Sequence, residues 1–351
     1  MKSWFGLGMG AALAVASAGC GLFPAEKASS PPVRLAWGAG RDAAETIQVC
    51  RKTGFNRLAV GGNPDKLLAA AEGQGIAIYF WDSNIVPRND AAMERFCQRM
   101  TPEEERLFLI DRKAEMPDPG GYQFGGEPLP EHHEVLATPL LCFHRPEVVA
   151  YRKAQIRKVL EEHPGLAGIA FDFYGYQNYH CCYCPCSVAL FERERAAGKY
   201  PDMSRNVAWR KFSEDTLIAF YNEMADYVRS LNPKLRTAAH VYPVYLPDPL
   251  YGNRLDIDEC AQTVAWFFPP YWSKDKIIDY TRIVVRDADR YYPRQIGVPF
   301  IGVYMRAKPV EQFRRELETI RAHSNGDLSL CGFADIVADP AYQQALIDTM
   351  K

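Results

Sequence analysis

The sequence has no excess of basic residues, since 41 Lys and Arg stand against 43 Asp and Glu for a formal net charge of −2. Binding to nucleic-acid phosphates needs a basic face or stripe, so we expect no nucleic-acid partner. After residue 20 the sequence also lacks an apolar run of the roughly 20 residues that span a bilayer. The chain is 48% hydrophobic and long enough to bury one large core.

The first 19 residues have the order of parts found in export signals. Lys2 supplies a positive charge, residues 4–18 are uncharged and mostly apolar, and small residues precede Cys20. This apolar part is shorter than a membrane span and is typical of a cleaved signal peptide. The stretch 16–20 resembles the lipobox of bacterial lipoproteins, which implies cleavage before Cys20 and lipid attachment to its thiol. An ordinary secretory signal that happens to precede a cysteine is the alternative.

The segment that follows Cys20 predicts a tether. Residues 20–32 are rich in Pro, Ser and Ala and show no apolar periodicity. Residue 21 is Gly, not the Asp that retains the resembling class at the inner membrane. We therefore expect residues 33–351 to form a domain anchored by lipid to the bacterial cell envelope, with the outer membrane favoured.

Residues 33–351 alternate short β-branched or aromatic runs with longer helical patterns. The predicted strands span residues 33–37, 57–60, 76–81, 167–173, 235–241, 263–268, 297–304 and 328–334. Eight alternations favour parallel strands closed into a single-domain (β/α)8 TIM barrel, with a long excursion between strands three and four. A doubly wound open sheet is the alternative, although no glycine-rich phosphate turn follows the first strand.

The carboxyl ends of the strands form the active site of such a barrel. Three carboxylates fall near these ends, so Asp82, Asp172 and Asp335 are the candidate catalytic residues. Asp172 lies in the apolar strand GIAFDFYGY, where a carboxylate without a partner costs free energy. Its alternative role is structural, as a buried partner of an arginine or of backbone amides.

The other strand ends are mostly aromatic, as expected for a groove in which sugar faces stack on rings and sugar hydroxyls bond to polar groups. The candidate substrate-binding residues are Trp37, Trp81, Tyr174, Tyr176, His240, Tyr242, Tyr271, Trp272, Tyr304 and Arg306. Trp266 and Phe268 are equally compatible with barrel packing.

The stretch 140–177 resembles the core of hypothetical glycoside-hydrolase-like TIM barrels. In that family a helix with the pattern "pevr.y" leads into a strand "DGihlDyiRy" and then a cysteine-rich loop. Residues 146–151, 168–172 and 181–186 match these three parts. The family's first Asp is Ala167 here. The chitinase-type pattern DxxDxDxE would place its Glu at Tyr174, so the resemblance does not imply chitinase chemistry.

Glycoside hydrolysis usually needs two carboxylates. Asp82 ends the strand next to that of Asp172 and predicts a close pair, whereas Asp335 is expected across the barrel mouth. Strand seven offers no Glu, which argues against an ordinary glycosidase. Three functions follow as hypotheses: a hydrolase of poly- or oligosaccharides, a carbohydrate-binding lipoprotein without catalysis, and a zinc-dependent hydrolase.

Four of the ten cysteines crowd into residues 181–186. Thiolate and imidazole groups at this spacing are typical of zinc sites, with His180, Cys181, Cys184 and Cys186 as the expected ligands. Export equally permits disulfides, for example to Cys142 or Cys260, and free thiols are the third option. In the first two cases the cluster would hold the loop after strand four in shape. No other cofactor is expected.

Overall fold

The computed structural model describes residues 31–83, 85–87, 90–102, 139–172, 174–178, 181–241, 251–267, 271–303 and 308–350. Residues 32–351 form one compact unit. The predicted signal peptide and lipidated Cys20 lie outside the described residues, as do His180, Tyr242, Tyr304 and Arg306. No helix in the described part of the chain is long and apolar enough to cross a membrane.

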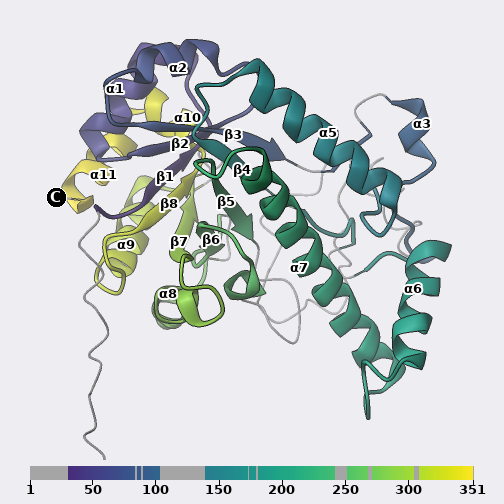
Figure 1. Cartoon of the computed structure of the whole chain (residues 1–351). Helices are drawn as coiled ribbons and strands as arrows, with labels where there is room; N and C mark the ends of the chain where they lie inside the picture. The colour runs from purple at the N-terminus through teal and green to yellow at the C-terminus, as the bar shows by residue number, and fades with distance from the viewer. Residues whose placement is uncertain are drawn as a thin grey trace, which may run out of the picture. The chain divides into compact units, whose positions relative to one another are not determined.

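Eight parallel strands form a closed barrel in which each strand pairs with the next and β8 pairs with β1 (Figure 1). The strands are β1 (Arg34–Trp37), β2 (Arg57–Val60), β3 (Ala77–Ser83), β4 (Gly168–Asp172), β5 (Arg236–Val241), β6 (Glu259–Thr263), β7 (Ile296–Gly302) and β8 (Leu328–Cys331). Helices separate most successive strands. The predicted (β/α)8 TIM barrel is therefore confirmed.

The helices pack around the barrel, and Figure 1 shows the long α7 running beside α5 with α6 next to its first half. The helices are α1 (Ala43–Thr53), α2 (Asp65–Ala71), α3 (Ala91–Glu94), α5 (Pro146–Glu162), α6 (Pro185–Ala196), α7 (Arg205–Leu231), α8 (Lys274–Asp287), α9 (Val310–Arg321), α10 (Phe333–Ala338) and α11 (Pro340–Met350). Two short 3₁₀ turns are η2 (Tyr251–Arg254) and η3 (Ala288–Arg290).

Local sequence signals begin and end several of these helices. The Asp42 side chain accepts a hydrogen bond from the Glu45 amide at the start of α1, and Gly54 ends that helix with φ 78°. Ser204 and Ser273 cap α7 and α8 in the same way as Asp42. Both ends of α1 are therefore marked by signals that can be read from the sequence.

Strand six is the main error of the sequence-based fold. The apolar run 263–268 predicted the strand, but β6 begins four residues earlier at Glu259. The run ECAQT does not look like a buried strand, yet all five residues are buried. The Glu259 carboxylate is paired with positive charges inside the barrel, and a buried charge is tolerated only with such partners. Trp266 therefore lies beyond the end of the strand.

Strand eight and the cysteine-rich loop also differ from expectation. β8 ends at Cys331 because Gly332, with φ 77°, turns the chain into α10, so Asp335 lies on a helix. The segment after β4 contains the helix α6, whereas its dense cysteines had suggested a loop.

An ion-pair cluster occupies the amino-terminal end of the barrel. The Glu259 carboxylate lies 2.5 Å from Arg57 Nε and 3.1 Å from Arg236 Nη2, and it accepts a hydrogen bond from the Tyr79 hydroxyl at 3.3 Å. Each of the three charged residues begins its strand, which brings β2, β5 and β6 together. Burial raises the pKa of Glu259, while the two arginines oppose that rise.

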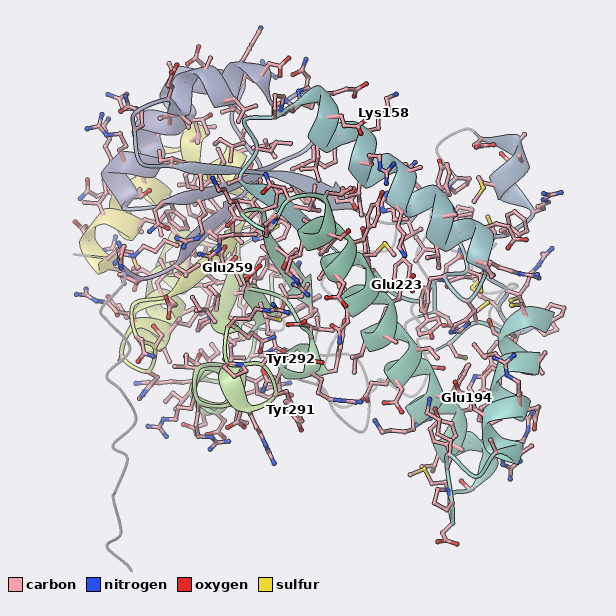
Figure 2. The ribbon with its side chains drawn as sticks, in the orientation of Figure 1. Lys158, Glu194, Glu223, Glu259, Tyr291 and Tyr292 are labelled. Carbon is pink, nitrogen blue, oxygen red and sulfur yellow. The ribbon has the colours of Figure 1, made fainter. Side chains whose placement is uncertain are left out.

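We predict that Glu259→Ala lowers the free energy of unfolding by about 3 kcal/mol, because Arg57 and Arg236 lose their shared counter-charge. Urea denaturation followed by circular dichroism measures the loss. The matched control is Glu162→Ala, which removes an exposed pair with Lys158 and should cost about 0.5 kcal/mol or less. Figure 2 shows Glu259 among the strands and Lys158 on the outer helix α5. Equal losses in the two variants would contradict this account.

Candidate active site at the barrel mouth

Asp172 ends β4 at the carboxyl end of the barrel, where its carboxylate meets two N–H groups. His240 Nδ1 lies 2.9 Å from Asp172 Oδ1, and Trp81 Nε1 donates to Asp172 Oδ2 at 3.0 Å. The Asp172 side chain is 14% exposed. β4 therefore presents a held but accessible carboxylate, and the described contacts of this carboxylate involve no arginine.

His240 is fixed from the side opposite Asp172. Its Nε2 lies 3.0 Å from Thr263 Oγ1, and its ring stacks on Phe300 with centroids 3.6 Å apart. The His240 side chain is only 3% exposed. Asp172, His240 and Thr263 thus form a chain of hydrogen bonds across β4, β5 and β6, and the two ring nitrogens of His240 face protein groups.

Aromatic side chains fill much of the mouth. Trp37 is buried and donates from Nε1 to Ser329 Oγ at 2.8 Å. Its ring packs edge-on against Trp81 and Phe300, with centroids 5.7 and 6.3 Å away. Trp81 is only half-buried, so it combines contact with Asp172 and access to solvent. Trp37 has the environment of a core residue rather than of a groove.

Asp82 does not form the expected close pair with Asp172. Successive strand residues point to opposite faces, so Trp81 turns into the barrel and Asp82 turns outward to α5. There Asp82 forms a buried ion pair with Arg152 and accepts a hydrogen bond from the Tyr174 hydroxyl. Arg152 Nε also donates to the Tyr174 hydroxyl at 2.9 Å. This Asp82–Arg152–Tyr174 triad joins β3, α5 and the residues after β4.

The two tyrosines after β4 are buried. Tyr174 is held in the triad, and its backbone N–H donates to the Tyr221 hydroxyl at 3.1 Å. The Tyr176 hydroxyl donates to the Ser213 carbonyl at 2.9 Å. Both rings pack between the barrel and α7, because the chain turns outward after Asp172. The sequence placed them in the groove because it counted them as a continuation of the strand.

Asp335 is associated with Asp172 through a shared neighbour. Cys331, half-buried at the end of β8, has a thiol whose pKa burial raises to about 12. The negative charges of Asp172 and Asp335 add to that rise, so both carboxylates lie within electrostatic range of one sulfur. Asp335 therefore remains a candidate partner of Asp172, whereas Asp82 is paired with Arg152.

Tyr271 and Trp272 follow β6 by several residues. Trp272 is buried against α8, where Lys276 Nζ lies 3.9 Å from its ring centroid. Tyr271 is half-buried, with Lys308 Nζ at 5.5 Å from its ring. Lys308 forms a buried ion pair with Glu316 of α9. Of the two rings, Tyr271 retains the larger access.

A thiol cluster lies between the start of α5 and the start of α6. The sulfur atoms of Cys142, Cys182 and Cys184 lie within 4.8 Å of one another, and those of Cys142 and Cys184 are 3.5 Å apart. Backbone N–H groups of Arg99 and Cys184 lie 3.5 and 3.4 Å from Cys182 Sγ, and that of Ser187 lies 3.5 Å from Cys184 Sγ. Three thiols thus face one point.

The members of this cluster differ from the expected ligand set. Cys181 instead packs with Phe191 and neighbouring aromatic residues, and Cys186 Sγ contacts the His144 carbonyl. Of the expected ligands, Cys184 belongs to this cluster, and His180 lies outside the described residues. No cysteine of the described residues forms a disulfide. The Cys260 thiol contacts the Gly252 carbonyl instead. The expected disulfides to Cys142 or Cys260 are absent from this part of the chain.

A polar pair supports the thiol cluster. Ser187 Oγ lies 3.2 Å from Cys184 Sγ, 3.4 Å from Cys142 Sγ and 2.7 Å from His144 Nδ1. Burial lowers the pKa of His144 to about 4, so its imidazole is neutral at pH 7. The cysteine spacing could not indicate Ser187, because a serine signals no metal chemistry by itself.

No protein-family model and no curated protein sequence matches this chain. Solved structures do match it in fold. A β-galactosidase from the Antarctic haloarchaeon Halorubrum lacusprofundi aligns with a TM-score of 0.55 at 13% identity over 91% of this chain and 57% of its own. A cold-adapted β-galactosidase from Rahnella sp. R3 aligns with a TM-score of 0.52 at 13% identity over 92% and 56%. The chain thus spans less than three fifths of these proteins, and the likeness establishes a glycosidase-like TIM-barrel fold.

We predict that Asp172→Asn and Asp335→Asn each increase the rate at which Cys331 is alkylated at pH 8 by several-fold. Loss of a nearby negative charge favours the thiolate, which is the reactive form. Iodoacetamide labelling followed by peptide mass spectrometry measures the rate at Cys331 alone. Asp348→Asn, on the exposed side of α11, is the control and should leave the rate unchanged. If the alkylation rate changed in only one of the two variants, the other carboxylate would not act on Cys331.

Proposed function

We propose that this chain is an exported, lipid-anchored glycoside-hydrolase-like protein that acts on a poly- or oligosaccharide at the barrel mouth. The observation that carries the proposal is Asp172, an accessible carboxylate at the end of β4 held by Trp81 and His240. The fold shared with proteins named β-galactosidases supports a carbohydrate as the substrate class. The signal-like residues 1–20 support export and a lipid at Cys20.

In this proposal Asp172 is the carboxylate that acts on the glycosidic bond and Asp335 is its partner. The half-buried ring of Trp81, directly beside Asp172, offers a face on which a sugar can stack. Tyr271 extends the contact surface, and Tyr242, Tyr304 and Arg306 remain proposed contacts. Trp37, Tyr174 and Tyr176 are buried and support the site from below or outside.

A carbohydrate-binding lipoprotein without catalysis is the second candidate. The specific observation in its favour is that residues 296–309, from β7 to the start of α9, contain no Asp or Glu. Asp82 is also committed to Arg152 in the interior. Any hydrolysis would then depend on Asp172 and Asp335 alone. If either residue had no catalytic role, the protein would bind the carbohydrate without cleaving it.

We expect wild-type protein to hydrolyse at least one member of a glycan panel that includes β-galactosides. Asp172→Asn should lower kcat/KM by about 100-fold or more, as removal of an acid–base group does, and leave binding of the same glycan within a few-fold. Reducing-end release measures the first quantity and calorimetry the second.

Asp348→Asn is the matched control for that experiment. Equal hydrolysis by wild type and Asp172→Asn would remove Asp172 from the reaction. Binding without hydrolysis by wild type would establish the carbohydrate-binding candidate instead.

We further propose that Cys142, Cys182 and Cys184 hold a structural zinc ion. Zinc–sulfur bonds of about 2.3 Å in a tetrahedron separate sulfur atoms by about 3.7 Å, close to the 3.5 Å between Cys142 and Cys184. Backbone N–H groups directed at the sulfurs would stabilise their thiolate forms. Ser187 Oγ is the described candidate for a fourth ligand. All three thiols are buried, as in structural zinc sites. This geometry favours a structural zinc ion over the catalytic zinc ion of a hydrolase.

Purified protein should contain about one zinc ion per chain by elemental mass spectrometry. Cys184→Ala should lose the zinc and lower Tm, because the ion would tie the loop after β4 to the start of α5. Cys260→Ala, a buried cysteine outside the cluster, is the control and should retain the zinc. Wild-type protein without zinc after growth and purification in zinc-containing medium would contradict this site.

A further inference from the structure

The Asp172 carboxylate has a ring nitrogen of a different residue beside each of its two oxygens. Trp81 reaches Oδ2 from β3, and His240 reaches Oδ1 from β5. The three residues come from adjacent strands, so the backbone ladder fixes the distances between them. We infer that Trp81 and His240 are positioning residues that hold Asp172 as the ionised carboxylate of the site, so that Asp172 serves as base or nucleophile and another group supplies the proton. This inference rests on the proposed function.

The contact with Trp81 is the firmest part of the argument. An indole N–H is a donor only, so Asp172 Oδ2 must act as the acceptor. A proton on Asp172 would weaken this contact, because an acid oxygen is a poorer acceptor than a carboxylate oxygen. Trp81 is itself locked by its edge-on contact with Trp37 at 5.7 Å. The donor therefore stays in place when the carboxylate reacts.

The contact with His240 depends on the tautomer of its ring, and the inference requires the proton on Nδ1. A neutral ring with its proton on Nδ1 donates to Asp172 and accepts at Nε2 from the Thr263 hydroxyl. Both ring nitrogens then have a hydrogen-bond partner, as expected for polar atoms of a side chain that is almost completely buried. The stack on Phe300 keeps the ring in that plane.

The groups around Asp172 divide the roles between two carboxylates. Trp81 from β3 and His240 from β5 contact the Asp172 carboxylate. Cys331 from β8 lies within electrostatic range of both Asp172 and Asp335 and adds no positive charge. A general acid must carry a proton when the substrate binds, and the paired N–H groups disfavour one on Asp172. In the proposed function Asp335 is the candidate group that provides this proton to the departing sugar oxygen.

The activity test compares two variants of His240. His240→Asn keeps an N–H near the position of Nδ1, and His240→Phe keeps the stack on Phe300 but has no N–H. We expect His240→Phe to lower kcat/KM by about 10- to 100-fold, mostly through kcat, and to move the acid limb of its pH profile to higher pH. His240→Asn should recover most of the rate and the original limb. A purely structural role would lower Tm in both variants and leave the acid limb in place.

A second measurement needs no substrate and so separates this inference from the proposed function. Nitrogen NMR of the wild-type protein should show His240 as the neutral Nδ1–H tautomer, and carbon NMR should show Asp172 ionised at neutral pH. Thr263→Val, which removes the hydroxyl with little change of volume, should release the tautomer preference. A protonated Asp172, or the Nε2–H tautomer in wild type, would overturn the inference even if glycans are hydrolysed. If no glycan is hydrolysed, the NMR result still decides it.

Discussion

The candidate site depends on the two-residue alternation of β3. Trp81 and Asp82 are neighbours in the chain, yet Trp81 turns into the barrel to meet Asp172 and Asp82 turns outward to meet Arg152. One residue of β3, Trp81, thus contacts the Asp172 carboxylate, and the next, Asp82, holds α5 through Arg152. Since register in a closed barrel is fixed by the neighbours on both sides, neither residue can change face without displacing the whole strand.

Charges are distributed along the barrel according to how they are compensated. At the amino-terminal end Glu259 is neutralised by Arg57 and Arg236, which makes that end a closed structural layer. At the opposite end Asp172 receives two N–H donors from Trp81 and His240. An acidic residue on a strand therefore serves packing at the amino-terminal end of the barrel and belongs to the candidate site at the opposite end.

The sequence predicted the barrel because periodicity, helix caps and chain length all pointed to it. It also placed Asp172 at a strand end correctly, since one acid in an apolar run stands out. It missed the side on which Asp82 lies, because alternation can be read only after the register is known. It missed Glu259 on β6, whose partners lie about 200 and 23 residues away in the chain. The sequence missed Cys142 as a member of the thiol cluster for the same reason, since Cys142 lies far in the chain from the dense cysteine motif.

The Asp82–Arg152–Tyr174 triad also limits how this protein can change over evolution. The chitinase-type pattern has a glutamate where this chain has Tyr174, and one substitution would restore it. That glutamate would enter a pocket in which a single arginine already balances Asp82. The pocket would then hold two negative charges and one positive charge. A glutamate at position 174 would therefore be tolerated best together with loss of the Asp82 charge, so the two changes are coupled.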